Sequence, residues 1–251
     1  MKEPKWIVAY FSPPGGTKKI ADAIAESFHS PVQEMDLTKP DCDTELSNND
    51  SLLAVLPVYA GRVPQIALER LDVFKAAGQK AAAVVVYGNR EYDDALLELK
   101  DSLEKIGFQV IAAAAFIAEH SMIRSIATAR PDETDRKIAH QFGADVIAKL
   151  NNPTPIQVPG NTPYRELKPS EVHPIADDTC VNCGICAGQC PVGAISTEDP
   201  RQTVSACCIN CMRCIQVCPH SSRFLPDAFL ASATAMLNEK ASGHKAPALF
   251  L

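Results

Sequence analysis

A cysteine pattern that occurs twice constrains this chain more than any other feature of its sequence. The first copy reads CVNCGICAGQCP (180–191) and the second reads CINCMRCIQVCP (208–219), so both have the spacing C-x2-C-x2-C-x3-C-P. In such a pattern three thiolates wrap a short loop around one iron–sulfur cluster, and the fourth cysteine ligates a second cluster. The doubled pattern therefore predicts two [4Fe–4S] clusters that exchange their fourth ligands.

The spacing assigns each ligand to a cluster. The predicted metal ligands of one cluster are Cys180, Cys183, Cys186 and Cys218, and those of the other are Cys208, Cys211, Cys214 and Cys190. This crossing ties together a unit whose apolar core is too small to fold well alone. A structural zinc module is the alternative, although zinc sites generally use two separated pairs of ligands. Cys207 is off-register and is interpreted as a spare thiol, and Cys42 as incidental.

Composition restricts the compartment and the partners. Nine of the ten cysteines lie between Cys180 and Cys218, a density that indicates metal ligation in a reducing compartment rather than disulfides. The N-terminus MKEPKWIVAYF has no signal-peptide cleavage site, and no run of eighteen apolar residues exists. We therefore expect a cytoplasmic protein without a membrane span. The net charge of −6 argues against a nucleic-acid partner.

Residues 1–150 alternate between strand and helix signals. Continuous apolar runs such as WIVAYF are typical of strands that are buried on both faces. We expect strands at 6–11, 32–37, 51–60, 81–88 and 108–118, and helices at 17–28, 64–75, 93–106 and 132–150. This order predicts an α/β fold with an open parallel sheet that is covered by helices on both faces.

The remainder of the chain divides by composition. Residues 151–173 are rich in proline and predict an extended linker without a core of its own. The cysteine-rich unit follows at 174–225. Residues 226–251 predict a helix that starts at Pro226 and a tail that is either a strap or a loose end.

The loop SPPGGT (12–17) follows the first predicted strand and opens the first predicted helix. Helix N-terminal N–H groups attract anions, Ser12 and Thr17 add hydroxyls, and the glycines let the backbone close around a phosphate. Neither a nucleotide P-loop nor a dinucleotide fingerprint is present. We interpret the loop as a site for a phosphate monoester, and the alternative is a simple strand-to-helix turn.

This loop resembles the flavodoxin phosphate loop, [ST]-x-T-G-x-T, and the resemblance extends over residues 1–150. It implies a five-stranded sheet of order 2-1-3-4-5 and bound FMN, with the flavin ring between the loops PVYAGRVP (57–64) and YGNREYDDAL (87–96). Pro14 stands where that family has threonine, which removes a hydroxyl and an N–H and implies weaker FMN binding. The cofactor-binding residues that the resemblance implies are Ser12, Pro14, Gly15, Gly16, Thr17, Pro57, Val58, Tyr59, Ala60, Gly61, Tyr87, Gly88, Asn89, Tyr92 and Asp93.

The cysteine-rich unit resembles bacterial two-cluster ferredoxins, most closely in DDTCVNCGICAGQCPVGAI (177–195). After the second copy, CPHSSR (218–223) replaces the usual small residues beside Cys218, and His220 is interpreted as a surface or neighbouring group rather than a ligand. The whole chain resembles the fusion of a flavodoxin-like domain with a small α+β two-cluster ferredoxin domain found in anaerobes. That resemblance implies a flavodoxin-like domain at 1–150 and a ferredoxin domain at 174–225.

These features together predict electron transfer. Each cluster carries one electron and FMN carries one or two, so the chain would couple one- and two-electron carriers. Eight thiolates and two oxidised cores change the net charge from −6 to about −10, which predicts redox partners with basic docking patches. We predict no catalytic residue, and Glu119 and His120 are expected to cap or bridge loops. Two alternatives stay open: a small FMN-dependent reductase of a quinone, metal or similar acceptor, and an iron–sulfur docking subunit whose flavodoxin-like domain is empty.

Overall fold

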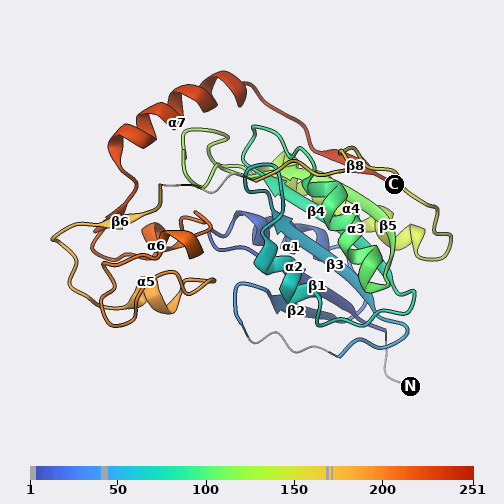
Figure 1. Cartoon of the computed structure of the whole chain (residues 1–251). Coiled ribbons are helices and arrows are strands. Elements are labelled where there is room, and N and C mark those ends of the chain that lie inside the picture. The colour runs from blue at the N-terminus through green and yellow to red at the C-terminus, as the bar shows by residue number, and fades with distance from the viewer. Residues whose placement is uncertain (1–3, 41–44, 168–169, 171) are drawn as a thin grey trace.

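The expected parallel sheet forms the centre of the N-terminal part of the chain (Figure 1). The computed structural model describes residues 4–40, 45–167, 170 and 172–251, so Cys42 lies outside the described residues. The order of the parallel strands, 2-1-3-4-5, is confirmed. These strands are β1 (Trp6–Tyr10), β2 (Val32–Asp36), β3 (Ser51–Pro57), β4 (Lys80–Tyr87) and β5 (Gln109–Ile117).

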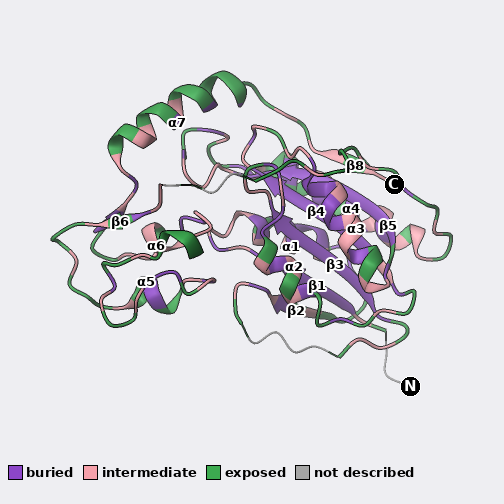
Figure 2. Ribbon diagram, in the orientation of Figure 1, coloured by how far each residue is buried: buried purple, intermediate pink, exposed green. Residues whose placement is uncertain are grey.

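Two pairs of helices cover the two faces of this sheet, as the alternating pattern predicts. Helices α1 (Gly16–Ala25) and α4 (Glu133–Lys149) pack on one face, and α2 (Gln65–Leu71) and α3 (Ala95–Ile106) pack on the other. Successive residues of a strand point to opposite faces, so both faces of each strand contact an apolar layer. Strands β1, β3, β4 and β5 are accordingly almost wholly buried (Figure 2), which explains their continuous apolar sequences. The edge strand β2 is mostly exposed or half-buried.

The C-terminal tail adds a strand that the sequence did not predict. After α7 (Asp227–Lys240), strand β8 (Ala248–Phe250) pairs antiparallel with β5, so the full order is β2-β1-β3-β4-β5-β8. The tail is therefore neither a loose end nor only a strap. An edge strand presents unpaired N–H and C=O groups, and β8 pairs with part of the β5 edge, at residues 113–115. Helix α7 packs on Ile123 and Ile126 in the loop after β5.

The proline-rich segment also contacts the sheet domain. The Asp94 carboxylate, at the start of α3, accepts hydrogen bonds from the backbone N–H groups of Asn161 (2.8 Å) and Arg165 (2.7 Å). The Tyr164 hydroxyl donates to Asp101, about two helical turns further along α3. Because Asn161, Tyr164 and Arg165 all bond to α3 or its start, this part of the proline-rich segment runs along α3 rather than extending into solvent.

The cysteine-rich unit contains two short structural repeats. Strands β6 (Ile175–Ala176) and β7 (Arg223–Phe224) form an antiparallel pair, and the helical turns are α5 (Ile185–Gly188), η1 (Ser205–Cys207) and α6 (Arg213–Gln216). Both α5 and α6 begin directly after a residue in the left-handed conformation. Within the described residues, no helix is long and apolar enough to cross a membrane.

Candidate cofactor sites

The eight cysteines of the repeated pattern line two separate cavities of the small unit. One cavity is lined by Cys180, Cys183, Cys186 and Cys218, which we name the outer cysteine group. The other is lined by Cys190, Cys208, Cys211 and Cys214, which we name the inner cysteine group. All nine cysteines that the structure describes are free thiols. The four cysteines of each predicted ligand set therefore line one cavity, and the ligation itself stays a prediction.

The surroundings of the inner cysteine group disfavour isolated thiolates. Burial raises the pKa of the Cys211 thiol to about 12 and that of Cys214 to about 11, and it also raises the pKa of Cys208. Buried thiolates need a cation, and the iron of a cluster supplies positive charge to each sulfur. Each cysteine of a cubane binds its own iron, and four thiols line this cavity. This donor set therefore fits a [4Fe–4S] cluster.

The turn after Cys218 directs backbone donors at its sulfur. Burial acts to raise the pKa of the Cys218 thiol, but hydrogen bonds from the backbone N–H groups of His220, Ser222 and Arg223 outweigh it and lower the pKa. These donors come from CPHSSR, the stretch in which the second copy departs from the first. The backbone of His220, rather than its ring, makes this contact. Such N–H groups also stabilise thiolate ligands of a cluster.

Arg223 is a buried side chain that the sequence analysis missed. Its guanidinium donates to Cys186 Sγ (3.8 Å) of the outer cysteine group and to the carbonyl oxygens of Pro174 (3.1 Å) and Pro200 (2.5 Å). It also lowers the pKa of Cys214, of the inner cysteine group, against the larger effect of burial. The signal that could have identified it is a positive charge in CPHSSR, at a point of the repeat where the first copy has an apolar residue.

A further cavity, of about 160 Å³, lies at the carboxyl ends of β1, β3, β4 and β5. Ligands bind at this edge of open parallel sheets. The predicted cofactor residues that line it are Pro14, Gly16, Thr17, Pro57, Val58, Tyr59, Tyr87 and Gly88. Four residues that the sequence did not identify also line this cavity: Lys19, Arg124, Arg130 and Gln216. Gln216 belongs to α6 of the cysteine-rich unit, a contact that only the tertiary structure reveals.

The phosphate loop has the backbone form that an anion site requires. Gly15 has φ +91°, which favours glycine, and a Cβ at Gly16 would lie 3.0 Å from that of Ala118. Ser12 Oγ accepts a hydrogen bond from the Lys18 N–H (2.9 Å). The first N–H groups of α1, from Gly16 onward, have no partners within the helix and are suited to an anion.

Other predicted cofactor residues lie outside this cavity. Ser12 and Gly15 line a neighbouring cavity of about 530 Å³ against the inner cysteine group, and Tyr92 and Asp93 line one of about 480 Å³ against the proline-rich segment. Ala60 is exposed. The Gly61 carbonyl accepts a hydrogen bond from the Asp94 N–H (3.2 Å), so the loops 57–64 and 87–96 contact each other.

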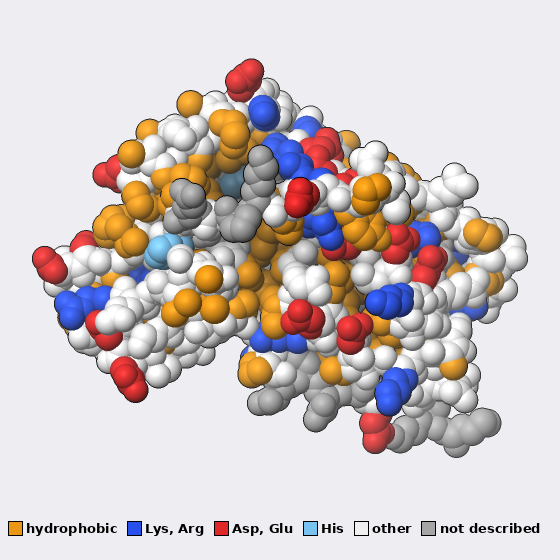
Figure 3. Space-filling view, viewed as in Figure 1, with side chains coloured by type: hydrophobic (Ala, Val, Ile, Leu, Met, Phe, Trp, Pro, Cys, Tyr) orange, Lys and Arg blue, Asp and Glu red, His pale blue; other side chains and the backbone are white. Residues whose placement is uncertain are grey.

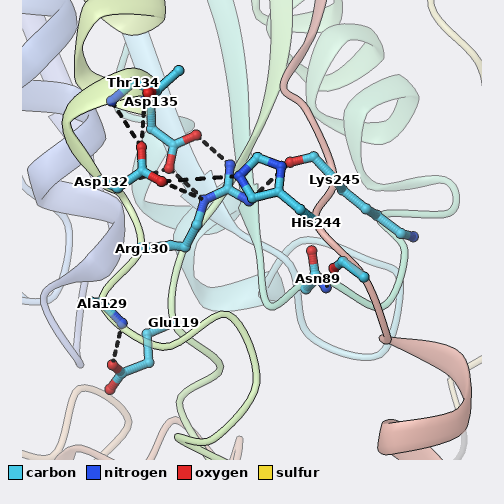
Figure 4. Close-up of polar contacts among 10 residues, drawn as sticks. Asn89, Glu119, Ala129, Arg130, Asp132, Thr134, Asp135, His244 and Lys245 are labelled. Atoms are coloured by element: carbon cyan, nitrogen blue, oxygen red, sulfur yellow. Dashed lines mark hydrogen bonds and ion pairs between the residues drawn. The ribbon is translucent and has the colours of Figure 1, made fainter.

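The C-terminal segment contacts the loops that follow β4 and β5 (Figure 4). The Asn89 amide donates to the carbonyl oxygens of Ala241 (2.6 Å) and Gly243 (2.9 Å), in the segment after α7. Arg130 forms a buried ion pair with Asp135 and donates to the Lys245 carbonyl (2.9 Å). The tail therefore binds the Asn89 side chain that the sequence analysis assigned to the flavin edge.

Glu119 and His120 bridge segments of the loop after β5, which is the role we expected for them. The Glu119 carboxylate accepts hydrogen bonds from the Ala129 N–H (3.0 Å) and from Arg124. Nδ1 of His120 accepts from the N–H groups of Met122 (3.3 Å) and Ile123 (3.1 Å). Since Nδ1 is an acceptor, the neutral imidazole carries its proton on Nε2.

The inner cysteine group lies against the cavity at the sheet edge. Arg213, beside Cys214, donates to the Pro13 carbonyl of the phosphate loop (3.2 Å), and Arg70 of α2 donates to the Pro191 carbonyl (2.7 Å). Tyr59 lines the cavity, and its buried hydroxyl has no hydrogen-bond partner among the described residues. Burial raises the pKa of this hydroxyl, and the nearby Cys211 raises it further.

These observations test the fit to FMN. The loop at Gly15–Thr17 suits a phosphate, and the Tyr59 hydroxyl offers an unused polar group in the same cavity. Small-molecule sites usually have volumes of about 300–1,000 Å³, whereas this cavity has about 160 Å³. The phosphate end therefore fits, and a flavin ring requires a wider cavity than the one observed.

Comparison with known proteins separates the two parts of the chain. Residues 173–196 match the family described as 4Fe-4S binding domain. Over 32 residues the chain is 48% identical to a ferredoxin of Clostridium butyricum, which corresponds to 13% of this chain and spans 58% of that protein. The match thus concerns the small unit alone.

The similar solved structures cover the sheet domain. They include a flavodoxin from the domain Archaea (17% identity, TM-score 0.44, covering 59% of this chain and 99% of that chain). Flavodoxin 1 of Bacillus cereus has 19% identity and a TM-score of 0.43, and covers 57% of this chain and 97% of that chain. The strand order observed here is itself that of flavodoxin-like folds. The chain therefore joins a flavodoxin-like fold to a segment similar to 4Fe-4S ferredoxins.

Proposed function

We propose that this protein transfers electrons between two [4Fe–4S] clusters, held by the outer and inner cysteine groups, and FMN at the sheet edge. One observation carries the proposal: the inner cysteine group and the phosphate loop meet through the Arg213 contact to Pro13. Each cluster exchanges one electron and FMN exchanges one or two. In this proposal the residues of the chain supply the positions of the three groups.

The contacts support an order for the electron path. The inner cysteine group adjoins Tyr59 and the phosphate loop, whereas the cavity of the outer cysteine group is lined only by residues of the small unit. Cys183 of the outer cysteine group is exposed. In the proposed path, external electrons exchange at the outer cysteine group, then pass to the inner cysteine group and the flavin site.

The surface around the outer cysteine group supports a protein partner with a basic rim. Val181 and Ile185, beside these cysteines, are 59% and 39% exposed. The same unit carries the exposed acidic residues Asp177, Asp178 and Glu198, and Figure 3 shows carboxylates together with basic side chains at this end of the molecule. A small apolar contact with complementary charges suits a transient redox encounter.

Cofactor analysis tests the proposal. Protein purified without oxygen is expected to contain about eight irons, about eight acid-labile sulfides and one FMN per chain. Zinc with little iron would contradict the proposed clusters. Full iron and sulfide without flavin, even after incubation with excess FMN, would contradict the flavin step alone.

A second candidate has an observation in its favour. The sheet-edge cavity of about 160 Å³ is small for a flavin, and the tail occupies the amide of Asn89. A flavodoxin-like domain without cofactor would then act as a scaffold that docks the cluster unit into a larger complex. The FMN titration separates the two candidates, since only the first predicts saturable binding with one flavin per chain.

A further inference from the structure

The guanidinium of Arg223 is buried, and it contacts no carboxylate of the described residues. The residue is 2% exposed, and within the described part of the chain its acceptors are carbonyl oxygens, the Thr203 hydroxyl and a cysteine sulfur. Its Nε is buried and has no hydrogen-bond partner there. A buried charge is costly unless an opposite charge compensates it. The observed hydrogen bonds solvate the guanidinium but do not neutralise it.

Arg223 lies where negative charge would accumulate. Its side chain lines the cavity of the outer cysteine group and donates to Cys186 Sγ. Its charge and a hydrogen bond also act on Cys214 of the inner cysteine group. Four thiolates and an oxidised cubane core carry a net negative charge, which increases by one when the cluster is reduced.

The internal repeat carries this cation in one half only. Arg223 follows Cys218 by the same interval as Ile195 follows Cys190. Ile195 is buried and lines the cavity of the inner cysteine group, whereas Arg223 lines that of the outer cysteine group. The two halves thus present an apolar side chain to one cavity and a cation to the other. The difference in charge lies in a region of low dielectric, where it acts strongly.

We propose that Arg223 is the internal counter-charge of the outer cluster, which is the cluster held by the outer cysteine group. In this proposal it keeps the reduction potential of the outer cluster above that of the inner cluster, which the inner cysteine group holds. This inference rests on the proposed binding of [4Fe–4S] clusters by the two cysteine groups. Reduction adds a negative charge, so a cation fixed beside Cys186 stabilises the reduced state of the outer cluster more than the oxidised one. The first electron taken up by the pair then resides on the outer cluster.

The test compares Arg223→Met, which removes the charge but keeps an unbranched chain, with Arg223→Lys, which retains the charge. Arg201→Met is the matched control, because Arg201 is an exposed arginine of the same unit that contacts Asp199. Iron and sulfide are measured first. Redox titrations followed by electron paramagnetic resonance then give the potential of each cluster, and the Cys190→Ala variant identifies the signal of the outer cluster.

We expect Arg223→Met to lower the equilibrium constant for reduction of the outer cluster at least tenfold, which is 59 mV for one electron. The inner cluster shifts less, Arg223→Lys recovers most of the wild-type potential, and Arg201→Met stays within about threefold of wild type, as expected for an exposed charge. Unchanged potentials in Arg223→Met, or an equal shift in Arg223→Lys, would overturn the inference.

Failure of assembly also decides the question. If Arg223→Met binds no clusters, Arg223→Gln replaces it as an uncharged variant with hydrogen-bonding capacity. Loss of clusters in both uncharged variants but not in Arg223→Lys supports a required positive charge. Loss in all three variants contradicts it, because geometry rather than charge would then be the requirement. Absence of iron in the wild type would instead contradict the proposed function itself.

Discussion

The two cysteine loops have the same spacing and nearly the same backbone, yet they have different surroundings. Cys183 of the first loop is exposed, whereas Cys211, its counterpart in the second loop, is buried. Val181 is exposed to solvent, but its counterpart Ile209 packs against the apolar core of the sheet domain. The ligand spacing therefore determines how a cluster is held, and the residues between the ligands determine what the cluster faces.

The difference indicates that the repeat has separated into a solvent-facing half and a domain-facing half. Arg213 of the second loop bonds the phosphate loop, and the corresponding residue in the first loop is the exposed Ile185. A partner can therefore approach the outer cysteine group, while the flavin site adjoins the inner one. Each prediction below tests one part of this contrast.

Removing one crossed ligand should have the largest effect. Cys190→Ala is expected to eliminate the cluster of Cys208, Cys211 and Cys214, which is distant in sequence, and to leave the outer cluster intact. The reason is that Cys190 lines the cavity of the inner cysteine group. About half of the iron should be lost. Iron analysis and electron paramagnetic resonance measure the result.

Cys218→Ala is the matched control, with the opposite outcome expected. It should remove the outer cluster and retain electron exchange between the inner cluster and the flavin. Loss of the nearer cluster in both variants would show that the fourth ligands are not exchanged.

Truncation of Arg213 should weaken the junction between the cysteine-rich unit and the phosphate loop, where Arg213 contacts Pro13, but should leave both clusters bound. A hydrogen bond that involves a charged group contributes about 1.5–3 kcal/mol, so Arg213→Ala should increase local opening by roughly 10- to 100-fold. We expect the lower end because the Arg70 contact to Pro191 remains. Hydrogen exchange at the backbone N–H groups of Ser12, Gly15 and Gly16 and of residues 209–216 measures the opening.

Arg201→Ala is the control for this experiment, because Arg201 is exposed and contacts Asp199 within the same unit. It should leave exchange at the junction unchanged. Equal protection of the junction in wild type and Arg213→Ala would contradict a role for Arg213 in docking the two parts.

Pro14→Thr examines the other side of the junction, at the phosphate loop. Threonine supplies an N–H and a hydroxyl that proline lacks, and one recovered bond to a phosphate would tighten FMN binding by roughly 10- to 100-fold. Water at the site and the loss of proline's stiffness reduce the gain, so about tenfold is expected. Flavin-fluorescence titration of protein without FMN measures it. Equal or weaker binding in the variant would contradict a phosphate site at this loop.

Much of the fold follows from local sequence signals. The apolar runs at 6–11 and 81–88 identify buried strands, and the 3.6-residue period at 17–28 identifies α1, because each signal extends over a whole element. Strand β8 has only three residues, Ala248–Phe250, and its stability depends on pairing with the distant β5. No local pattern of that length distinguishes a strand from a coil.

The residues of the candidate sites also differ in whether local sequence or distant contacts determine their positions. The grouping of the cysteines follows from their spacing, since the ligands are close in sequence apart from one crossed residue per group. The positions of Asn89 and Arg223 depend on contacts with segments far along the chain, such as Gly243 and Pro174. Sequence alone indicates that these side chains are polar, and it does not indicate which distant segment will satisfy them.

The smallest predicted effect concerns the backbone that the two loops share. Gly193 has φ +62°, and its counterpart in the second loop, Ser221, has φ +53°. A left-handed residue other than glycine costs about 1–2 kcal/mol, but glycine loses about 0.5–1 kcal/mol more conformational freedom on folding. Ser221→Gly should therefore stabilise the outer loop by about 0.5 kcal/mol, and Gly193→Ser should destabilise its counterpart by a similar amount. In moderate denaturant, iron release to a chelator should slow about twofold in the first variant and accelerate about twofold in the second, as that free energy implies. Acceleration in both variants would show that Ser221 makes a contact of its own that outweighs the backbone cost, and the two loops would then differ in backbone energetics as well as in surroundings.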